Sequence, residues 1–175
     1  MKNNHTWVIC AYGESEFLEA CILSLQAQTL PSKIICYSST PLDSIKQLCQ
    51  KYGIPFYTKE GGGIGKDWNN ALSFVETSYA TIAHQDDYYE PTYLEAVMQK
   101  IEQSKDILIA YTDYFEEKNG VKIPANTNLK IKTLMLKTLN LMPSSRFWRN
   151  RVLAFGNPIS CPAVTYNLET LRDFR

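Results

Sequence analysis

The first 110 residues alternate short apolar runs with stretches of helical periodicity, and this alternation constrains the fold more than any other feature of the sequence. The apolar runs predict strands over Thr6–Cys10, Lys33–Tyr37, Ile54–Tyr57, Tyr79–Ala83 and Asp106–Tyr114. The intervening segments predict helices over Glu16–Gln28, Leu42–Tyr52, a stretch from Trp68 to Val75, and Tyr93–Ile101. Strands that alternate with helices form a parallel sheet covered on both faces. We therefore predict a three-layer α/β fold, with the third strand at an edge because Pro55 cannot donate a ladder hydrogen bond.

The pattern changes in the last third of the chain. Asn119-Gly120 predicts a turn into Val121–Ile123, and the later segments predict two helices and an extended stretch over Leu129–Met142, Arg146–Phe155 and Asn157–Tyr166. The first of these helices places Ile131, Leu134, Met135 and Leu141 on one side and Lys130 and Lys137 on another. It is interpreted either as a packed helix with solvated lysines, which we favour, or as a helix that docks on an anionic membrane.

Charge is distributed unevenly along the chain, although its net value is zero. Residues 1–117 hold 8 basic and 16 acidic side chains, whereas residues 118–175 hold 10 basic and 2 acidic ones. A dedicated nucleic-acid binder needs clustered lysine and arginine, so the balanced total argues against that class. We predict two halves of one domain, 1–117 and 118–175.

The cysteines and the N-terminus predict a cellular compartment. Five cysteines without a close C-x-x-C pair are typical of reduced thiols, and they are Cys10, Cys21, Cys36, Cys49 and Cys161. Residues 1–5 lead directly into the first strand, which predicts neither a signal peptide nor a transmembrane anchor. We expect a cytoplasmic protein with at most peripheral contact with the cytoplasmic face of a membrane.

Polar and glycine-rich segments follow four of the predicted strands. They are Ala11–Glu14, Ser38–Thr40, Gly61–Asp67 and His84–Asp87. In an open parallel sheet, ligands bind beyond the carboxyl ends of the strands. The segments offer an aromatic ring, hydroxyl groups, flexible backbone and two carboxylates, which together suit a charged ligand with a planar base.

The adjacent carboxylates Asp86 and Asp87 are the strongest chemical signal. Two neighbouring carboxylates repel each other, and a cation relieves the repulsion. Their hard oxygen ligands suit Mg²⁺ or Mn²⁺ bound to a diphosphate. The alternative, at even weight, is that they cap the helix that follows. His84 is either a ligand, a hydrogen-bonding group or a core residue.

The glycine-rich loop does not match the common phosphate-binding patterns. Glu60 and Asp67 break the pattern G-x-x-x-x-G-K-[ST], and Lys66 and Trp68 break the pattern G-x-G-x-x-G. These mismatches argue against nucleotide triphosphatases and dinucleotide dehydrogenases. The sequence also lacks H-E-x-x-H and G-x-S-x-G, so zinc and serine hydrolases have no support.

Taken in order, these segments resemble the family 2 glycosyltransferases, which bind nucleotide sugars on a Rossmann-like fold called GT-A. Val8–Glu14 resembles an apolar strand followed by Pro-x-Tyr-Asn-Glu, and Leu18–Thr29 is similar to the helix that comes next. Asn69 stands where the family has Asn in its Gly-…-Arg-Asn segment, and His84–Asp87 stands at the metal-binding Asp-x-Asp-Asp. The resemblance covers about residues 6–115 and continues more weakly to the end.

The resemblance implies a role for each matching residue. A nucleotide-sugar site would be formed by Ala11, Tyr12, Glu14, Ser39, Lys66, Asp67, Asn69 and Asp86. Asp86 would be the main ligand of Mn²⁺ or Mg²⁺, His84 a second one, and Asp87 would act as the catalytic residue facing the sugar or the acceptor. The implied reaction is sugar transfer from a nucleoside diphosphate to a hydroxyl of a saccharide or lipid-linked acceptor, with inversion, in bacterial surface polysaccharide synthesis.

Several positions depart from the family pattern. Ser38-Ser39 replaces a pair of aspartates, one of which binds the base, and His84 replaces the first acid of the metal motif. The family's general base is a later carboxylate, but residues 118–175 contain only Glu169 and Asp173. We therefore predict a truncated form that binds the donor, in which residues 1–117 are the donor half and residues 118–175 the start of the acceptor half, and whose base lies beyond Arg175. The alternatives are a non-catalytic nucleotide-sugar binding module and a nucleotidyltransferase.

Overall fold

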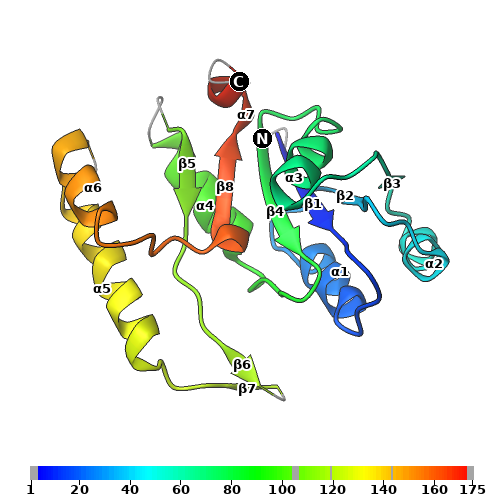
Figure 1. Ribbon diagram of the computed structural model, residues 1–175, viewed down its shortest axis with the longest axis horizontal. Coiled ribbons are helices and arrows are strands. Elements are labelled where there is room, and N and C mark those ends of the chain that lie inside the picture. The colour runs from blue at the N-terminus through cyan, green and yellow to red at the C-terminus, as the bar shows by residue number, and fades with distance from the viewer. Residues whose placement is uncertain (1–3, 104–106, 119, 143, 173–175) are drawn as a thin grey trace. The chain divides into compact units, whose positions relative to one another are not determined.

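The computed structural model describes residues 4–103, 107–118, 120–142 and 144–172, which divide into two compact units (Figure 1). The first unit consists of residues 1–110 with 164–175, and the second of residues 111–163. A six-stranded sheet has the order β3-β2-β1-β4-β8-β5. Its strands are β1 His5–Cys10, β2 Lys33–Tyr37, β3 Phe56–Tyr57, β4 Tyr79–His84, β5 Ile109–Tyr111 and β8 Val164–Asn167.

The sheet is mostly parallel, as predicted. β1 pairs in parallel with β2 and β4, and β2 pairs in parallel with β3, which lies at the edge as Pro55 indicated. β8 runs antiparallel to β4, with Thr165 opposite Thr81. Because β1 to β4 are parallel, their carboxyl ends lie at one edge of the sheet.

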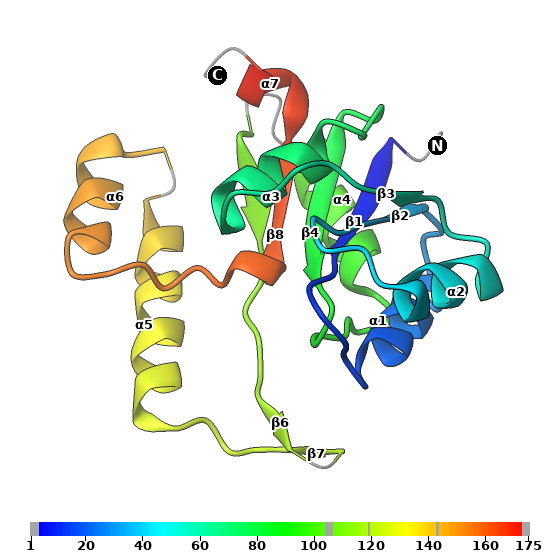
Figure 2. The same cartoon turned by 45° about the vertical axis from the view of Figure 1, so that its right-hand side comes forward.

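Helices cover both faces of the sheet (Figure 2). On one face lie α1 Leu18–Gln26, α2 Asp43–Lys51 and α4 Tyr93–Glu102, and on the other lie α3 Ile64–Leu72 and α7 Leu168–Arg172. Successive residues of β1 point to opposite faces, so Trp7 and Ile9 pack with α1 and α2, whereas Val8 packs with α3. The three-layer prediction is therefore confirmed.

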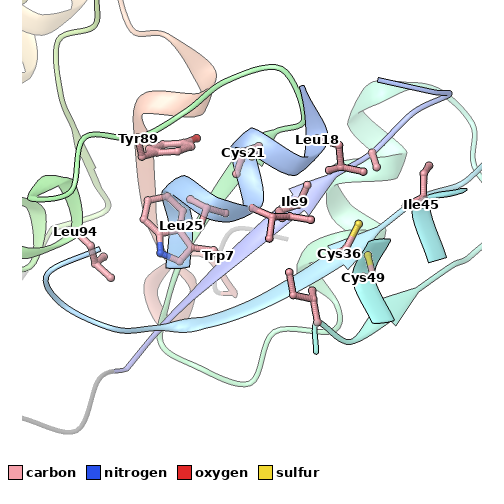
Figure 3. Packing of buried hydrophobic residues seen from close by; sticks show 14 residues of the cluster. Trp7, Ile9, Leu18, Cys21, Leu25, Cys36, Ile45, Cys49, Tyr89 and Leu94 are labelled. Atoms are coloured by element: carbon pink, nitrogen blue, oxygen red, sulfur yellow. The ribbon is translucent and has the colours of Figure 1, made fainter. Parts of the chain in front are cut away.

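The larger hydrophobic core lies between the sheet and α1 and α2 (Figure 3). Trp7 is fully buried, with its ring 4.6 Å from that of Tyr89 and 5.4 Å from that of Tyr93. All five cysteines are free; Cys21, Cys36 and Cys49 are buried in this core, Cys10 is half-buried and Cys161 is exposed. Most of the cysteines thus act as small apolar residues.

The second unit contains two helices and a hairpin. The helices are α5 Thr127–Leu141 and α6 Arg146–Leu153, and the hairpin pairs β6 Glu117–Lys118 with β7 Val121–Lys122. The indole N–H of Trp148 donates to the Thr138 carbonyl at 2.7 Å and joins α6 to α5. A short 3-10 turn, Cys161–Ala163, leads into β8.

The predicted inner side of α5 is wrong. The buried residues of α5 are Leu129, Leu136 and Leu139, whereas the side chains predicted to pack include Ile131, Leu134 and Leu141, which are 53%, 62% and 73% exposed. Apolar residues lie all round this helix, so periodicity does not define one inner side. No helix in the described ranges is long and apolar enough to span a membrane.

Several sequence-based boundaries also differ from the structure, and the strand before the second unit differs most. The predicted strand Asp106–Tyr114 is reduced to Ile109–Tyr111, and Asp106 and the turn residue Asn119 lie outside the described residues. The first compact unit ends at residue 110 and takes up Val164–Asn167 again, because β8 pairs with β4. The functional division into a donor half and an acceptor half stays a prediction.

Candidate nucleotide-sugar site

The predicted metal ligands converge at the carboxyl end of β4. His84 ends the strand, and Asp86 and Asp87 follow in a turn in which the Asp87 N–H donates to the His84 carbonyl at 3.2 Å. One potential ligand atom from each of the three side chains lies within 4.8 Å of the other two. The turn therefore gathers two carboxylates and an imidazole at one point.

The surroundings of His84 fit a cation-binding role. Its Nδ1 lies 3.8 Å from Asp87 Oδ2, and its Nε2 is buried without a hydrogen-bond partner among the described residues. Trp68 of α3 packs against the imidazole, and the centroids of the two rings are 5.7 Å apart. Imidazole nitrogen and carboxylate oxygen are both ligands of Mn²⁺, so this donor set fits the divalent cation that the sequence predicted.

Asp87 is half-buried, whereas Asp86 is exposed. Burial raises the pKa of the Asp87 carboxyl above its usual value, the charge of Asp86 raises it further, and His84 opposes both effects. A bound cation would favour the ionised form.

The interpretation of Asp86 and Asp87 as helix caps is wrong. The next helix, α4, begins at Tyr93 with Thr92 as its N-cap residue, and no side chain caps it. The carboxylates are therefore free for another role.

Gln85 connects the carboxyl ends of β1 and β4. The Tyr12 N–H donates to Gln85 Oε1 at 3.0 Å, and Gln85 Nε2 donates to the Tyr12 carbonyl at 2.8 Å. Ala11 is buried, and its N–H donates to the Tyr37 carbonyl at 2.8 Å, so the segment is also tied to β2. The Tyr12 side chain remains 71% exposed and presents a ring at this edge.

The remaining predicted residues fall into a pair and three separate positions. Ser39 Oγ donates to Asp67 Oδ2 at 3.0 Å, which joins the end of β2 to the first turn of α3. The exposed Lys66 bends back to donate to the Gly61 carbonyl at 3.0 Å, and Asn69 is exposed on α3. Glu14 lines a different hollow of about 390 Å³, between the start of α1 and the helix α2.

The sequence profile of the family "Glycosyl transferase family 2" matches residues 6–161. The chain belongs to this family. Glycosyltransferase GlyA of Streptococcus pneumoniae is 24% identical to it over 123 residues, which are 66% of this chain and 18% of GlyA. The match to GlyA therefore covers a small part of that protein.

Solved structures show that this family 2 chain has the GT-A fold. S. aureus TarS 1-349 has a TM-score of 0.67 at 19% identity over 97% of this chain and 48% of TarS. The mannosyltransferase PcManGT from Pyrobaculum calidifontis, in complex with GDP-Man and Mn²⁺, has a TM-score of 0.65 at 11% identity over 99% of this chain and 47% of PcManGT. The chain spans about half the length of these proteins.

Two residues of this family 2 site were missed by sequence reasoning. Gln85 fixes the Tyr12 backbone, and Trp68 packs on His84. Both residues lie next to motif residues in the sequence. However, Gln85 contacts a residue 73 positions away, and Trp68 contacts a residue 16 positions away. The signal that could have indicated them is their place between motif residues.

Proposed function

We propose that this chain binds a nucleoside-diphosphate sugar at the carboxyl edge of its sheet, as the donor site of an inverting, metal-dependent glycosyltransferase. The observation that carries the proposal is the convergence of His84, Asp86 and Asp87 in a turn whose Gln85 is hydrogen-bonded to the backbone of Tyr12, a residue with an exposed ring. Diphosphate and base need different recognition groups, and this edge offers both. PcManGT in complex with GDP-Man and Mn²⁺, and TarS in complex with UDP-GlcNAc, support the assignment.

The metal would be held by Asp86 and His84, with Asp87 as the third group. When bound, Mn²⁺ or Mg²⁺ supplies charge neutralisation for a diphosphate leaving group. Tyr12 offers a stacking face to the base, and the N-terminus of α3 at Gly63 offers backbone N–H groups to an anion. In this proposal the half-buried Asp87 would face the sugar or the acceptor.

The general base is the missing part of this proposal. Glu169 is the one carboxylate that the structure describes in residues 118–172, and it bonds with Ser78, just before the start of β4. That position is the edge of the sheet opposite to Asp86, while Asp173 lies outside the described residues. We therefore assign donor binding to this chain and deprotonation of the acceptor hydroxyl to a carboxylate outside it.

Two further parts of the proposal concern the acceptor and the place where the reaction occurs. We place the reaction in bacterial surface polysaccharide synthesis, consistent with the bacterial sources of GlyA and TarS. Peripheral contact of a cytoplasmic protein with an anionic membrane is supported by the exposed Ile131, Leu134 and Leu141 together with Lys130 and Lys137 of α5. Sedimentation with vesicles of anionic and of neutral lipid tests this contact, and equal binding to both kinds of vesicle would rule out a specific contact with anionic lipid.

A thermal-shift screen tests donor binding. UDP, GDP, dTDP and CDP are each added with and without Mn²⁺ to the chain, to Asp86→Ala and to the control Asp43→Ala, whose carboxylate pairs with Lys46 on the exposed side of α2. We expect a Mn²⁺-dependent rise in Tm with at least one nucleotide, lost in Asp86→Ala and kept in Asp43→Ala. The absence of any nucleotide effect would overturn donor binding.

A transfer assay separates the enzyme from a binding module. We expect background transfer by the 175-residue chain, and turnover once a longer form supplies the base. Robust transfer by the 175-residue chain would overturn the truncation. Metal-dependent binding without turnover in the longer form would favour the non-catalytic binding module.

A further inference from the structure

The segment that carries the proposed metal ligands has no regular structure of its own. Residues 85–92 connect β4 to α4 without forming a helix or a strand, and they include Asp86 and Asp87. Backbone groups outside helices and strands need other hydrogen-bond partners where they are shielded from water. Here side chains of Leu18–Thr29 supply them. This stretch resembles the family's first helix and has no role in the proposed donor site.

Two hydrogen bonds from α1 flank the pair of carboxylates. Cys21 Sγ donates to the His84 carbonyl at 3.3 Å, two residues before the pair. The Tyr89 N–H donates to Ser24 Oγ at 3.1 Å, two residues after the pair. Cys21 and Ser24 are three positions apart, so they lie on the same face of α1. The backbone is therefore tied to one helix on both sides of the acidic turn.

The hydroxyl of Ser24 is itself held in place. Ser24 Oγ donates to the Cys21 carbonyl at 2.8 Å, so its single proton is committed and its lone pairs remain for the Tyr89 N–H. The Tyr89 ring is buried against Trp7, with 4.6 Å between the ring centroids. Tyr89 is thus fixed through its backbone and through its side chain.

Gln28, just beyond α1, holds the far end of the same segment. Its side chain is buried, and all three of its hydrogen bonds go to backbone groups. Nε2 donates to the Ser24 carbonyl at 3.2 Å and to the Glu90 carbonyl at 2.9 Å. Oε1 accepts from the N–H of Leu94, in the first turn of α4, at 3.0 Å. The whole connection from β4 to α4 is therefore fastened to α1.

A fixed backbone matters for two adjacent carboxylates. The like charges of Asp86 and Asp87 repel each other, and a loose turn would let them move apart. Mg²⁺ and similar small divalent cations need nearly regular octahedral ligation, whereas Ca²⁺ accepts 6–8 oxygen ligands in flexible arrangements. A rigid turn therefore favours the small cation, and a loosened turn loses this advantage while it can still bind Ca²⁺.

We propose that Cys21, Ser24 and Gln28 are positioning residues that hold the acidic turn rigid and thereby make it select Mn²⁺ over Ca²⁺. They act through the backbone of the segment that carries Asp86 and Asp87. This inference rests on the proposed function, because the cation is the one assigned to the donor site.

Ser24→Ala is the test variant, because it removes one hydroxyl from a half-buried position, whereas a change at the buried Gln28 would leave several backbone groups unpaired. Ser24→Thr keeps the hydroxyl. Ser73→Ala is the matched control, because Ser73 Oγ also donates to the carbonyl three residues earlier, that of Asn70, at 2.6 Å, but accepts from Lys59.

Electron paramagnetic resonance of free Mn²⁺ measures the Kd of Mn²⁺ for the protein without nucleotide, and displacement by Ca²⁺ gives the second Kd. We expect the wild type to bind Mn²⁺ at least about 10-fold more tightly than Ca²⁺. Ser24→Ala should lower this ratio to about 3 or less, while Ser24→Thr and Ser73→Ala keep it. The ratio is insensitive to partial unfolding, because both cations bind the same folded fraction.

The outcomes separate the inference from the proposed function. An unchanged ratio in Ser24→Ala, or an equal fall in Ser24→Thr, would overturn the role of the hydroxyl and leave donor binding standing. Equal affinities of the wild type for Mn²⁺ and Ca²⁺ would overturn the selectivity alone. The absence of Mn²⁺ binding by the wild type would overturn both the inference and the metal dependence of the proposed function.

Discussion

The side-chain amide of Gln85 and the backbone of Tyr12 form a reciprocal pair of hydrogen bonds, at 3.0 Å and 2.8 Å. The pair joins the segment after β1 to the turn after β4, while the Tyr12 ring stays 71% exposed. A ring on a fixed backbone can stack on a base without the free-energy cost of ordering the loop first. Gln85 therefore gives Tyr12 its position in the proposed site.

Gln85→Ala should weaken nucleotide binding without unfolding the protein. Two hydrogen bonds of roughly 0.5–1.5 kcal/mol each are lost, so we expect the Kd for UDP with Mn²⁺ to rise about 5- to 150-fold, as measured by calorimetry. The control is Gln26→Ala, whose amide also donates to a backbone carbonyl, that of Tyr52, away from the sheet edge. Wild-type affinity in Gln85→Ala would show that the pair does not serve the nucleotide.

Gly61→Ala should disturb the Ser39–Asp67 pair, because the added Cβ meets both side chains at less than 3.0 Å. We expect a loss of UDP affinity of about 10-fold or more by calorimetry, since the loop or the pair must shift. Gly65→Ala is the matched control in the same segment, because nothing lies within 4 Å of its Cβ and alanine favours the helix by up to about 1 kcal/mol. Equal UDP affinities of the two variants would contradict this prediction.

The sequence predicts the central strands well and their partners poorly. The prediction of Lys33–Tyr37 matches β2, and those of β1 and β4 differ by one residue, because each is an apolar run bounded by polar residues. The register of β8 against β4 and the bond between Ser39 and Asp67 join residues far apart in the sequence, so local patterns contain no signal for them. Gln85 was missed for the same reason.

A buried hydrogen-bonded chain crosses β1, β4 and β8. His5 Nδ1 and Nε2 each lie 2.9 Å from a hydroxyl, those of Ser32 and Thr81, and Thr81 lies 2.6 Å from Thr165. Ser32 donates its own proton to the His5 carbonyl at 2.6 Å, so Nδ1 carries the imidazole proton and Nε2 accepts from Thr81. The imidazole is therefore held neutral.

Protonation of His5 should destabilise the fold below neutral pH. Burial lowers the pKa of His5 from 6.5 to about 3, so its contribution to stability is complete above pH 6.5 and is lost as the pH falls toward 3. Between pH 7.5 and pH 5, His5 should account for about 2 kcal/mol of lost unfolding free energy in urea titrations. His5→Gln should lack this part of the decline and His84→Gln should keep it; identical declines in all three proteins would refute the assignment.

Trp7→Phe should be much milder than Trp7→Ala. The Trp7 ring is fully buried, and its Nε1 has no partner among the described residues. Removing the ring should cost about 3–5 kcal/mol, whereas phenylalanine keeps most of the apolar volume and removes an N–H whose burial is itself unfavourable. We expect urea unfolding to show a loss of under about 2 kcal/mol for Trp7→Phe. Equal losses for the two variants would contradict this prediction.

The antiparallel strand β8 can pair with β4 only late in the synthesis of the chain. Thr81 finds its partner Thr165 only 84 residues later in the chain. One side of β4 therefore stays unpaired on the ribosome while residues 111–163 are made, and an open strand edge is a site for wrong pairing. The turn with Asp86 and Asp87 directly follows β4, so the nascent chain contains this acidic turn before β8 completes the sheet.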